Sequence, residues 1–212
     1  MQTLRVCACR GAAPPWTPAG RRCAPALHGS HPLPVATYRL SLQTVNRARR
    51  SVVAAAAYRA GERLSDETTG WGYDYSAKAA AVRAVALIGW DGSRQALWNA
   101  AGRAERRADA VVGREVQVSI PHELSADRQT AVAMALGRWL HERYGVAVDV
   151  AVHEPGRRSD HRNVHAHLLF TSRVVDAGGQ FGAKTRVLDN RRTGSVEVEA
   201  MRAEWARLCN AA

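Results

Sequence analysis

Long apolar runs and clustered cysteines are both missing from this sequence of 212 residues. No stretch of about 18 consecutive apolar residues occurs, which excludes a transmembrane helix. The four cysteines lie near the two ends of the chain, at Cys7, Cys9, Cys23 and Cys209, without a C-x-x-C pair. They indicate neither a zinc site nor a disulfide framework. Such sparse cysteine usage is typical of a protein of the reducing cytoplasm.

Lysine is almost absent, although the chain is strongly basic. Of the 30 Lys and Arg residues only Lys78 and Lys184 are lysine, and the formal net charge is +11. Arginine binds phosphate through two parallel hydrogen bonds, so this composition favours a polyanionic partner such as nucleic acid. A biased base composition of the gene produces the same arginine and alanine excess. Composition alone therefore leaves both explanations open.

Residues 1–34 lack hydrophobic periodicity and acidic residues, but they contain six of the eight prolines. They also lack the continuous apolar region of a signal peptide. We predict that this segment is disordered, or is an extension produced by an upstream start codon, with Val35 as the alternative start. Residues 35–212 have the length of one domain. The sequence ends inside a helical pattern without a cap, so we expect that domain to be truncated at its C-terminus.

The remaining patterns predict an α+β fold. Alternation of apolar and polar residues predicts strands at residues 37–42, 114–120, 146–153 and 164–170, and an apolar run predicts another at 82–88. Helical patterns occur at residues 51–60, 93–104, 125–144 and 196–210, and the first two begin at the expected N-caps Ser51 and Ser93. Residues 62–81 are expected to form a polar loop or hairpin. The expected architecture is an antiparallel sheet with helices packed on one face and a free face opposite.

Three histidines are predicted to lie together on the free face. His165 and His167 alternate with apolar residues, so their side chains project from the same side of a strand. His153 ends the strand at residues 146–153, on the side opposite its four valines. A His-x-His pair alone is more often structural, but a third histidine in phase favours a divalent metal site.

Other polar side chains fall on the same predicted face, namely Arg39, Ser41, Glu115, Gln117 and Asp149. The loop at residues 154–162 adds a Pro-Gly turn and the cations Arg157, Arg158 and Arg162. This combination suits an anionic substrate held next to the metal.

Tyr58 is the candidate nucleophile. It lies on the alanine-rich helix at residues 51–60, next to Arg59, where small residues would let the helix approach a substrate backbone. A tyrosine packed into the core explains the pattern equally well. Tyr73 and Tyr75 in the following loop are competitors, so the pattern alone does not decide.

Four segments together resemble the MobA/MobL family of conjugative relaxases and the N-terminal relaxase part of TraA-like transfer proteins. In order they are AAAAYRAGERLSDETTGWGYDYSAK, LWNAAGRAERRADAVVGREVQVSIP, RYGVAVDVAVHEP and RNVHAHLLFTSR. The resemblance covers roughly residues 35–210. Such proteins are HUH endonucleases, named for a His-hydrophobe-His pair, which here is His165-Ala166-His167.

The resemblance implies a five-stranded antiparallel sheet with helices behind it, and strand-specific nicking of DNA at a plasmid origin of transfer for conjugative mobilisation. It implies that His153, His165 and His167 hold Mg²⁺ or Mn²⁺. It implies that Tyr58 attacks the scissile phosphate, forming a 5′-phosphotyrosine, and that Glu115 orients the site or accepts the tyrosine proton. The implied partners, in the bacterial cytoplasm, are single-stranded DNA beside an inverted repeat and accessory proteins of the relaxosome.

Basic side chains are predicted to contact DNA phosphates, namely Arg39, Arg59, Arg157, Arg158, Arg162, Lys184 and Arg186. The family often has histidine where this chain has Arg39, so the role of that position is open. Residues 178–185 look like a P-loop but have Ala183 where glycine is required, and we interpret them as a basic loop. The charged run at residues 105–109 is expected to be a solvated helix end.

Two alternative functions remain. A replication-initiating or transposon nickase of the HUH class performs the same chemistry, but many of these carry the tyrosine after the histidine pair. The other alternative is a non-catalytic DNA-binding remnant of a truncated relaxase gene. Formation of a covalent adduct with a labelled oligonucleotide discriminates between an active nickase and a remnant.

Overall fold

The structure is a computed structural model that describes residues 39–156 and 160–212. The predictions for residues 1–34, and those for Arg157 and Arg158, lie outside the described residues. Within the described part of the chain, no helix combines the length and the apolar character that crossing a membrane requires.

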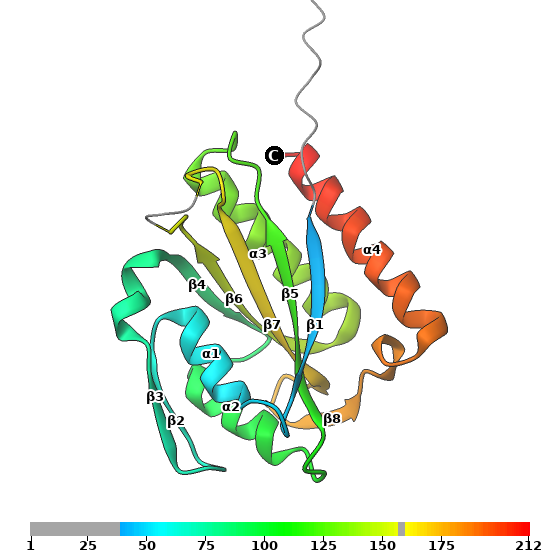
Figure 1. Ribbon diagram of the computed structural model, residues 1–212. Helices are drawn as coiled ribbons and strands as arrows, with labels where there is room; N and C mark the ends of the chain where they lie inside the picture. Colours follow the sequence, from blue (N-terminus) through cyan, green and yellow to red (C-terminus); the bar gives the residue numbers. More distant parts are fainter. Residues whose placement is uncertain (1–38, 157–159) are drawn as a thin grey trace, which may run out of the picture. The chain divides into compact units, whose positions relative to one another are not determined.

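A sheet of six antiparallel strands is the centre of the fold (Figure 1). Five strands follow one another in the order β1 (Leu40–Asn46), β5 (Val111–Ser119), β7 (His165–Val175), β6 (Val146–His153) and β4 (Val82–Ile88), and β8 (Phe181–Lys184) also pairs with β7. The α+β class and the antiparallel sheet are confirmed. The sixth strand, β8, arises in the glycine-rich segment, where the sequence shows no alternation.

A separate hairpin follows the first helix. It consists of β2 (Arg63–Asp66) and β3 (Trp71–Asp74), and a short 3-10 helix, η1 (Ser76–Ala81), comes next. Of the two structures expected for residues 62–81, the hairpin is therefore the one observed. Another short 3-10 helix, η2 (Arg186–Leu188), follows β8.

Three of the four α-helices in the described residues begin at serine caps, of which Ser51 and Ser93 were predicted. They are α1 (Val52–Ala60), α2 (Arg94–Arg103) and α3 (Ala126–Tyr144), and the hydroxyls of Ser51, Ser93 and Ser125 accept hydrogen bonds from their first-turn amides. α1 and α3 end at Gly61 and Gly145, which both adopt the left-handed conformation that glycine tolerates best. The fourth helix, α4 (Arg191–Asn210), begins five residues earlier than predicted because the Asn190 side chain caps it.

Helices α3 and α4 cover one face of the sheet (Figure 1). Most apolar residues of the alternating strands point to this face, among them Val116, Val118, Val148, Val150, Val152, Ala166, Leu168 and Phe170. They pack against the stripe of α3, in which Leu136 and Leu140 are fully buried. Burial of each such side chain contributes about 2 kcal/mol, so this layer is the main core.

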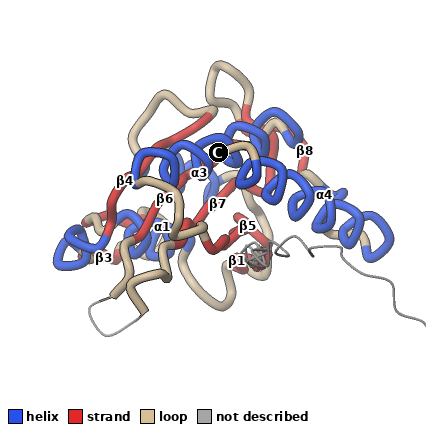
Figure 2. Tube along the Cα trace, turned by 90° about the horizontal axis from the view of Figure 1, so that it is seen from above, coloured by secondary structure: helices blue, strands red, loops and turns tan. Residues whose placement is uncertain are grey.

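Helices α1 and α2 cover half of the opposite face, which corrects the expectation of helices on one face only. Figure 2 shows α1 and α3 on opposite sides of the strands. A second apolar cluster joins α1 and α2 to the ends of the strands, through Val45, Val112, Ala147, Leu169 and Val175. Because these strand ends are apolar on both sides, they bury a second layer of helices. The uncovered half of this face is where β6 ends and β7 begins.

Candidate metal centre

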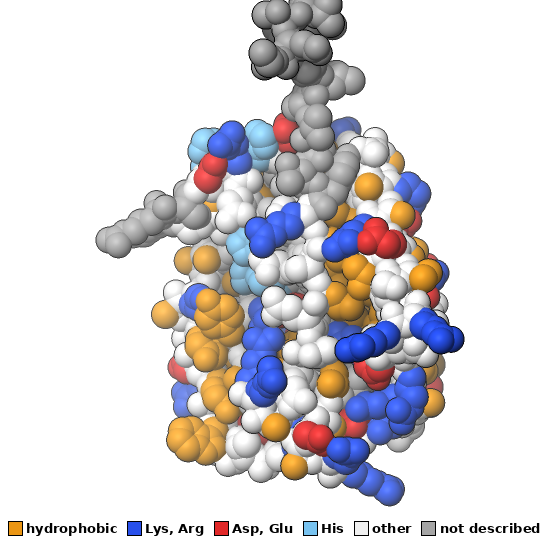
Figure 3. All heavy atoms as spheres, turned by 45° about the vertical axis from the view of Figure 1, so that its right-hand side comes forward, with side chains coloured by type: hydrophobic (Ala, Val, Ile, Leu, Met, Phe, Trp, Pro, Cys, Tyr) orange, Lys and Arg blue, Asp and Glu red, His pale blue; other side chains and the backbone are white. Residues whose placement is uncertain are grey.

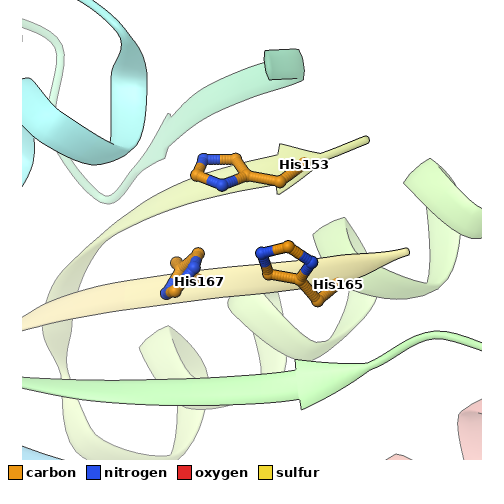
Figure 4. A group of neighbouring side chains, drawn as sticks. All are labelled: His153, His165 and His167. Atoms are coloured by element: carbon orange, nitrogen blue, oxygen red, sulfur yellow. The ribbon is translucent and has the colours of Figure 1, made fainter. Parts of the chain in front are cut away.

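Three histidine side chains converge on the uncovered half of the sheet. His153 of β6 lies opposite His165 of β7 in the strand register, and His167 follows two residues later on the same side. Their ring centroids are 4.9 to 5.3 Å apart. One ring nitrogen of each residue lies within 4.8 Å of the others. Figure 4 shows the three rings on one side of the two strands, as the alternation predicts.

Each imidazole is held by an oxygen at one of its two nitrogens. Carbonyl and carboxylate oxygens only accept, so the bonded nitrogen carries the hydrogen and the other keeps its lone pair. The pairs are His153 Nε2 with the Arg59 carbonyl at 2.7 Å, His165 Nδ1 with the Asn163 carbonyl at 3.0 Å, and His167 Nδ1 with Glu115 Oε1 at 2.6 Å. Oxygen partners of this kind orient histidine ligands in metal sites.

Burial keeps the first two of these histidines neutral. It lowers the pKa of His153 to about 4, and the neighbouring imidazoles and the charge of Lys78 act in the same direction. Burial also lowers the pKa of His165 below its ordinary value. Neutral imidazole is the form that binds a metal. In donor type and ring orientation, and in the neutral form of His153 and His165, the residues present therefore fit a divalent cation.

Glu115 lies beneath the histidines on β5 and is almost completely buried. Burial alone would raise its pKa, but hydrogen bonds from His167 and Arg59 outweigh burial and lower it to about 2. The carboxylate is therefore ionised, and both of its oxygens are already used by Arg59 and His167. The prediction placed Glu115 on the correct face, but the side chain is buried, not open.

Arg59 has a different environment from the one expected of a DNA contact. Its side chain is buried, with the residue 8 % exposed, and its guanidinium binds Glu115 and the Ala55 carbonyl. Two of its nitrogens, Nε and Nη2, donate to Glu115 on the sheet, and Nη1 donates to the Ala55 carbonyl within α1. In the structure, the Arg59 guanidinium is thus used to hold Glu115.

Tyr58 occupies the outer side of α1 and is 44 % exposed. This exposure excludes the alternative in which Tyr58 is a core residue. The Tyr58 and Tyr75 rings pack in a T-shaped pair with centroids 5.3 Å apart, and Lys78 Nζ lies 3.2 Å from the centroid of the Tyr58 ring. The next residue, Arg59, binds His153 through its carbonyl, so the last turn of α1 adjoins the histidine cluster. Tyr73 and Tyr75 are partly buried against the second core.

The other predicted DNA contacts are spread over the surface. Arg39 and Arg186 are exposed, and Arg162 is exposed but paired with Asp160 at 2.6 Å. Lys184 is paired with Glu105 at 3.0 Å and mostly buried. Basic side chains are distributed across the face in Figure 3, with histidines among them.

Glu105 differs from the predicted solvated helix end. The residue is buried and pairs with Arg173 at 2.8 Å as well as with Lys184. The chain after α2 therefore turns back onto β7 and β8, which the charged sequence of this segment did not indicate. The expectation was wrong at Glu105 and correct at Arg106 and Asp109, which are exposed.

Sequence reasoning missed two cations near the cluster. Arg50 precedes α1, and its guanidinium lies 3.5 Å from Glu115 Oε2. Lys78 belongs to η1, which has no recognisable periodicity. The one available signal for Lys78 was its rarity, as one of two lysines in an arginine-rich chain.

The sequence matches the MobA/MobL family over residues 50–212. It is 35 % identical over 207 residues to the mobilization protein MobL of Acidithiobacillus ferridurans, covering 84 % of this chain and 54 % of that protein. It is 29 % identical over 155 residues to the conjugal transfer protein TraA of Agrobacterium fabrum, covering 64 % of this chain and 13 % of that protein. The chain thus spans about half or less of the length of these curated relatives.

A solved structure described as the molecular basis of vancomycin resistance transfer in Staphylococcus aureus has a similar fold. Its TM-score is 0.69 at 23 % sequence identity, over 83 % of this chain and 92 % of that one. At this level of identity the likeness bears on the fold alone.

Proposed function

The chain belongs to the MobA/MobL family, and from this membership and its histidine cluster we propose that it nicks DNA at a plasmid origin of transfer during conjugative mobilisation. The observation that carries the proposal is the convergence of three oriented imidazoles next to the exposed Tyr58 on the adjoining turn of α1. A metal-binding cluster and a tyrosine nucleophile are the two parts that a tyrosine-dependent nickase requires.

His153, His165 and His167 would hold the metal, with Mg²⁺ or Mn²⁺ as the proposed ion. When bound, a divalent cation acts as a Lewis acid that polarises an oxygen of the scissile phosphate. The Arg59 and Asn163 carbonyls and the Glu115 carboxylate keep the rings in the required orientation.

Tyr58 is the proposed nucleophile. Its Oη attacks the phosphorus in line, a Tyr58–phosphate bond forms and the bond from phosphorus to the 3′ oxygen breaks. The 3′ oxygen leaves and takes up a proton, which gives a 5′-phosphotyrosine and a free 3′-hydroxyl. The reverse attack of that hydroxyl rejoins the strand, because the phosphotyrosine bond retains the energy of the original phosphodiester.

Glu115 is better suited to orientation than to accepting the tyrosine proton. With a pKa of about 2 and both oxygens bonded to Arg59 and His167, the carboxylate is a poor base at neutral pH. We assign it the role of fixing the His167 ring.

Single-stranded DNA beside an inverted repeat is the proposed substrate, with relaxosome proteins as further partners in the cytoplasm. The net charge of +11 supplies the general attraction. Among the described residues, the exposed cations Arg39, Arg162 and Arg186 are the proposed phosphate contacts. Arg162 would have to exchange its Asp160 partner for a phosphate.

The deciding experiment is a covalent-adduct assay with the Tyr58→Phe variant. Single-stranded fragments tiled across the DNA that carries the gene are incubated with protein and Mg²⁺ or Mn²⁺, and adducts are separated on a denaturing protein gel. The label must lie 3′ of the scissile phosphate, on the fragment that remains attached to tyrosine. We expect a shifted band with the wild type and none with Tyr58→Phe, although the variant binds the same DNA.

Tyr144→Phe is the matched control, because it removes a hydroxyl from a buried tyrosine on the opposite face of the sheet. It should form the adduct at the wild-type rate. An adduct of equal strength with Tyr58→Phe would move the nucleophile to another tyrosine. DNA binding without any wild-type adduct would instead support the non-catalytic remnant.

A further inference from the structure

Lys78 carries a charge that no acidic side chain neutralises within residues 39–156 and 160–212. It is partly buried on η1, and its Nζ lies 3.2 Å from the centroid of the Tyr58 ring. The other lysine, Lys184, is by contrast paired with the Glu105 carboxylate. A partly buried ammonium loses hydration, and a single cation–π contact offsets only part of that cost. The Lys78 ammonium is therefore available to an anion.

The fold fixes the location of Lys78. Gly61, in the left-handed conformation after α1, packs so closely on η1 that an added Cβ would lie 2.8 Å from the Ala79 N and Cα atoms. The Tyr75 amide donates to the Glu62 carbonyl at 3.1 Å, and the Lys78 amide donates to the Tyr75 carbonyl at 2.8 Å. These contacts attach η1 to the end of α1, directly after Tyr58. The backbone of Lys78 is thus fixed next to α1, and its side chain reaches the Tyr58 ring from there.

The segment that carries Lys78 also adjoins the histidine cluster, because η1 leads directly into β4, where Val82 pairs with His153 and the Ala81 carbonyl accepts a hydrogen bond from the Glu154 amide at 2.9 Å. Lys78 therefore lies on a segment that contacts both the helix of Tyr58 and the strand of His153. A phosphate attacked by Tyr58 must lie within this region. In phosphoryl transfer the negative charge of the transition state is spread over the non-bridging oxygens, and fixed cations next to them stabilise it.

We propose that Lys78 binds a non-bridging oxygen of the scissile phosphate while its contact with the Tyr58 ring holds the nucleophile in line. An ammonium has three N–H donors, so contact with the ring leaves donors for a phosphate oxygen. This inference rests on the proposed function, because it requires Tyr58 to be the attacking residue. It adds a catalytic cation, supplied by the chain itself, to the three histidines.

A purely structural role of Lys78 predicts a different experimental result. If Lys78 only stabilises the Tyr58 ring, its removal lowers the thermal midpoint slightly and leaves the chemical step intact. If Lys78 contacts the phosphate, its removal slows the chemical step and leaves folding nearly unchanged. The rate and the stability therefore separate the two roles.

The first test measures the single-turnover rate of adduct formation on an oligonucleotide whose nick site has been mapped with the wild type. We expect Lys78→Met to react about 100-fold more slowly, as when one donor to a developing oxyanion is removed. Lys78→Arg should recover most of the rate, because it keeps the charge and several donors. Arg202→Met is the control with the same charge change, on an exposed part of α4. A wild-type rate for Lys78→Met would overturn the inference.

The second test measures DNA binding in the Tyr58→Phe background, where no reaction occurs. One oligonucleotide spans the nick site, and the other ends at the 3′-hydroxyl before it and so lacks the scissile phosphate. Adding Lys78→Met should weaken binding of the spanning oligonucleotide several-fold and leave the shorter one unaffected. An equal loss for both, or no loss, would contradict a contact with the scissile phosphate.

The two proposals fail in distinguishable ways. If the wild type forms no adduct, or one that survives Tyr58→Phe, the proposed function is wrong and the inference about Lys78 falls with it. If a Tyr58-dependent adduct forms and Lys78→Met reacts normally, only the role of Lys78 is wrong.

Discussion

The two faces of the central sheet are built by opposite means from the same strands. Leu168 of β7 points into the layer under α3 and α4 and is fully buried among apolar side chains. Its neighbour His167 points to the other face, where it meets Glu115 and, through Glu115, Arg59. One face is therefore stabilised by removing apolar surface from water, and the histidine half of the other by pairing charges that burial would otherwise penalise. This separates the residues that stabilise the fold from those that form the site.

The polar face itself has two kinds of buried acid. Asp149 of β6 lies under α2, where it accepts hydrogen bonds from Arg94 and Trp98, each at 2.9 Å. These partners are one helical turn apart and enclose the carboxylate completely. The Glu115 carboxylate instead accepts a hydrogen bond from His167 of the histidine cluster. A buried carboxylate on this face is thus structural or functional according to its partners, which the alternation of the strand does not reveal.

The largest effect is expected when the polar face loses a histidine. His165→Ala should reduce metal binding and slow adduct formation by more than about 100-fold, since even the removal of an outer partner of a metal ligand costs 10–100-fold. The fold should remain intact, because His165 is only partly buried and holds no buried charge. Metal content and single-turnover rate are the measurements. His122→Ala, at an exposed histidine, is the control. Normal nicking by His165→Ala with unchanged metal content would contradict the assignment.

Alternation was sufficient to predict the histidine cluster and most of the sheet. His165 and His167 share a side because a strand has a period of two, and His153 is in phase for the same reason. The serine N-caps of α1 and α2 and the glycines that end α1 and α3 were equally predictable, because such residues satisfy helix ends locally.

Contacts between elements that lie far apart in the sequence could not be predicted from its patterns. In the alanine-rich α1, helical phase does not say which of Tyr58 and Arg59 faces the sheet, so Arg59 was expected on the surface. The burial of Asp149 depends on α2 docking over β6, and the burial of Glu105 depends on the return of the chain onto β7. Lys78 reaches Tyr58 only because η1 packs on Gly61. Each of these depends on packing between segments whose separation in sequence hides the contact.

The next largest effect should come from the structural acid of the polar face. Asp149→Asn keeps the shape but leaves the buried Arg94 with Glu62 as its remaining charged partner. We expect a loss of about 4 kcal/mol in the free energy of unfolding, as for other broken buried pairs. Urea denaturation measures it. Asp91→Asn, at an exposed position, should change stability little. Equal unfolding midpoints for the two variants would show that Asp149 does not stabilise the face.

A slightly smaller effect is expected from the apolar face. Leu168→Ala creates a cavity beneath α3 and should destabilise the protein by about 3 kcal/mol. The nicking rate of the folded fraction should stay near that of the wild type, although Leu168 adjoins His167. Val174→Ala, at an exposed residue of the same strand, is the control. A rate loss as large as that of His165→Ala would break the proposed separation of the two faces.

The smallest effect is expected from the hydrogen bonds that join α4 to α3 on the apolar face of the sheet. Glu197 accepts hydrogen bonds from Arg143 Nε and the Tyr144 hydroxyl, both at 2.7 Å. The bond from Arg143 lowers the pKa of Glu197 below its ordinary 4.5, against a smaller opposing effect of burial. Burial and the nearby Glu197 raise the pKa of Tyr144, so the hydroxyl remains a donor throughout the acid range.

Because the folded state lowers the pKa of Glu197, its contribution to stability is complete above pH 4.5 and is lost as the pH falls through the lowered value. The contribution should be less than about 1 kcal/mol, because the Arg143 side chain is 40 % exposed and solvent screens the pair. We therefore expect wild type and Glu197→Gln to differ in stability at pH 7 and to converge towards pH 3 in urea titrations. The stability of Glu199→Gln, at an exposed residue of the same helix, should change with pH as that of the wild type does, since Glu199 lacks the bonds to α3.

A constant difference in stability between wild type and Glu197→Gln across this range would mean that ionisation of Glu197 does not hold α4 to α3. The nicking rate of Glu197→Gln should equal that of the wild type at neutral pH, because this link lies behind the sheet from the histidines.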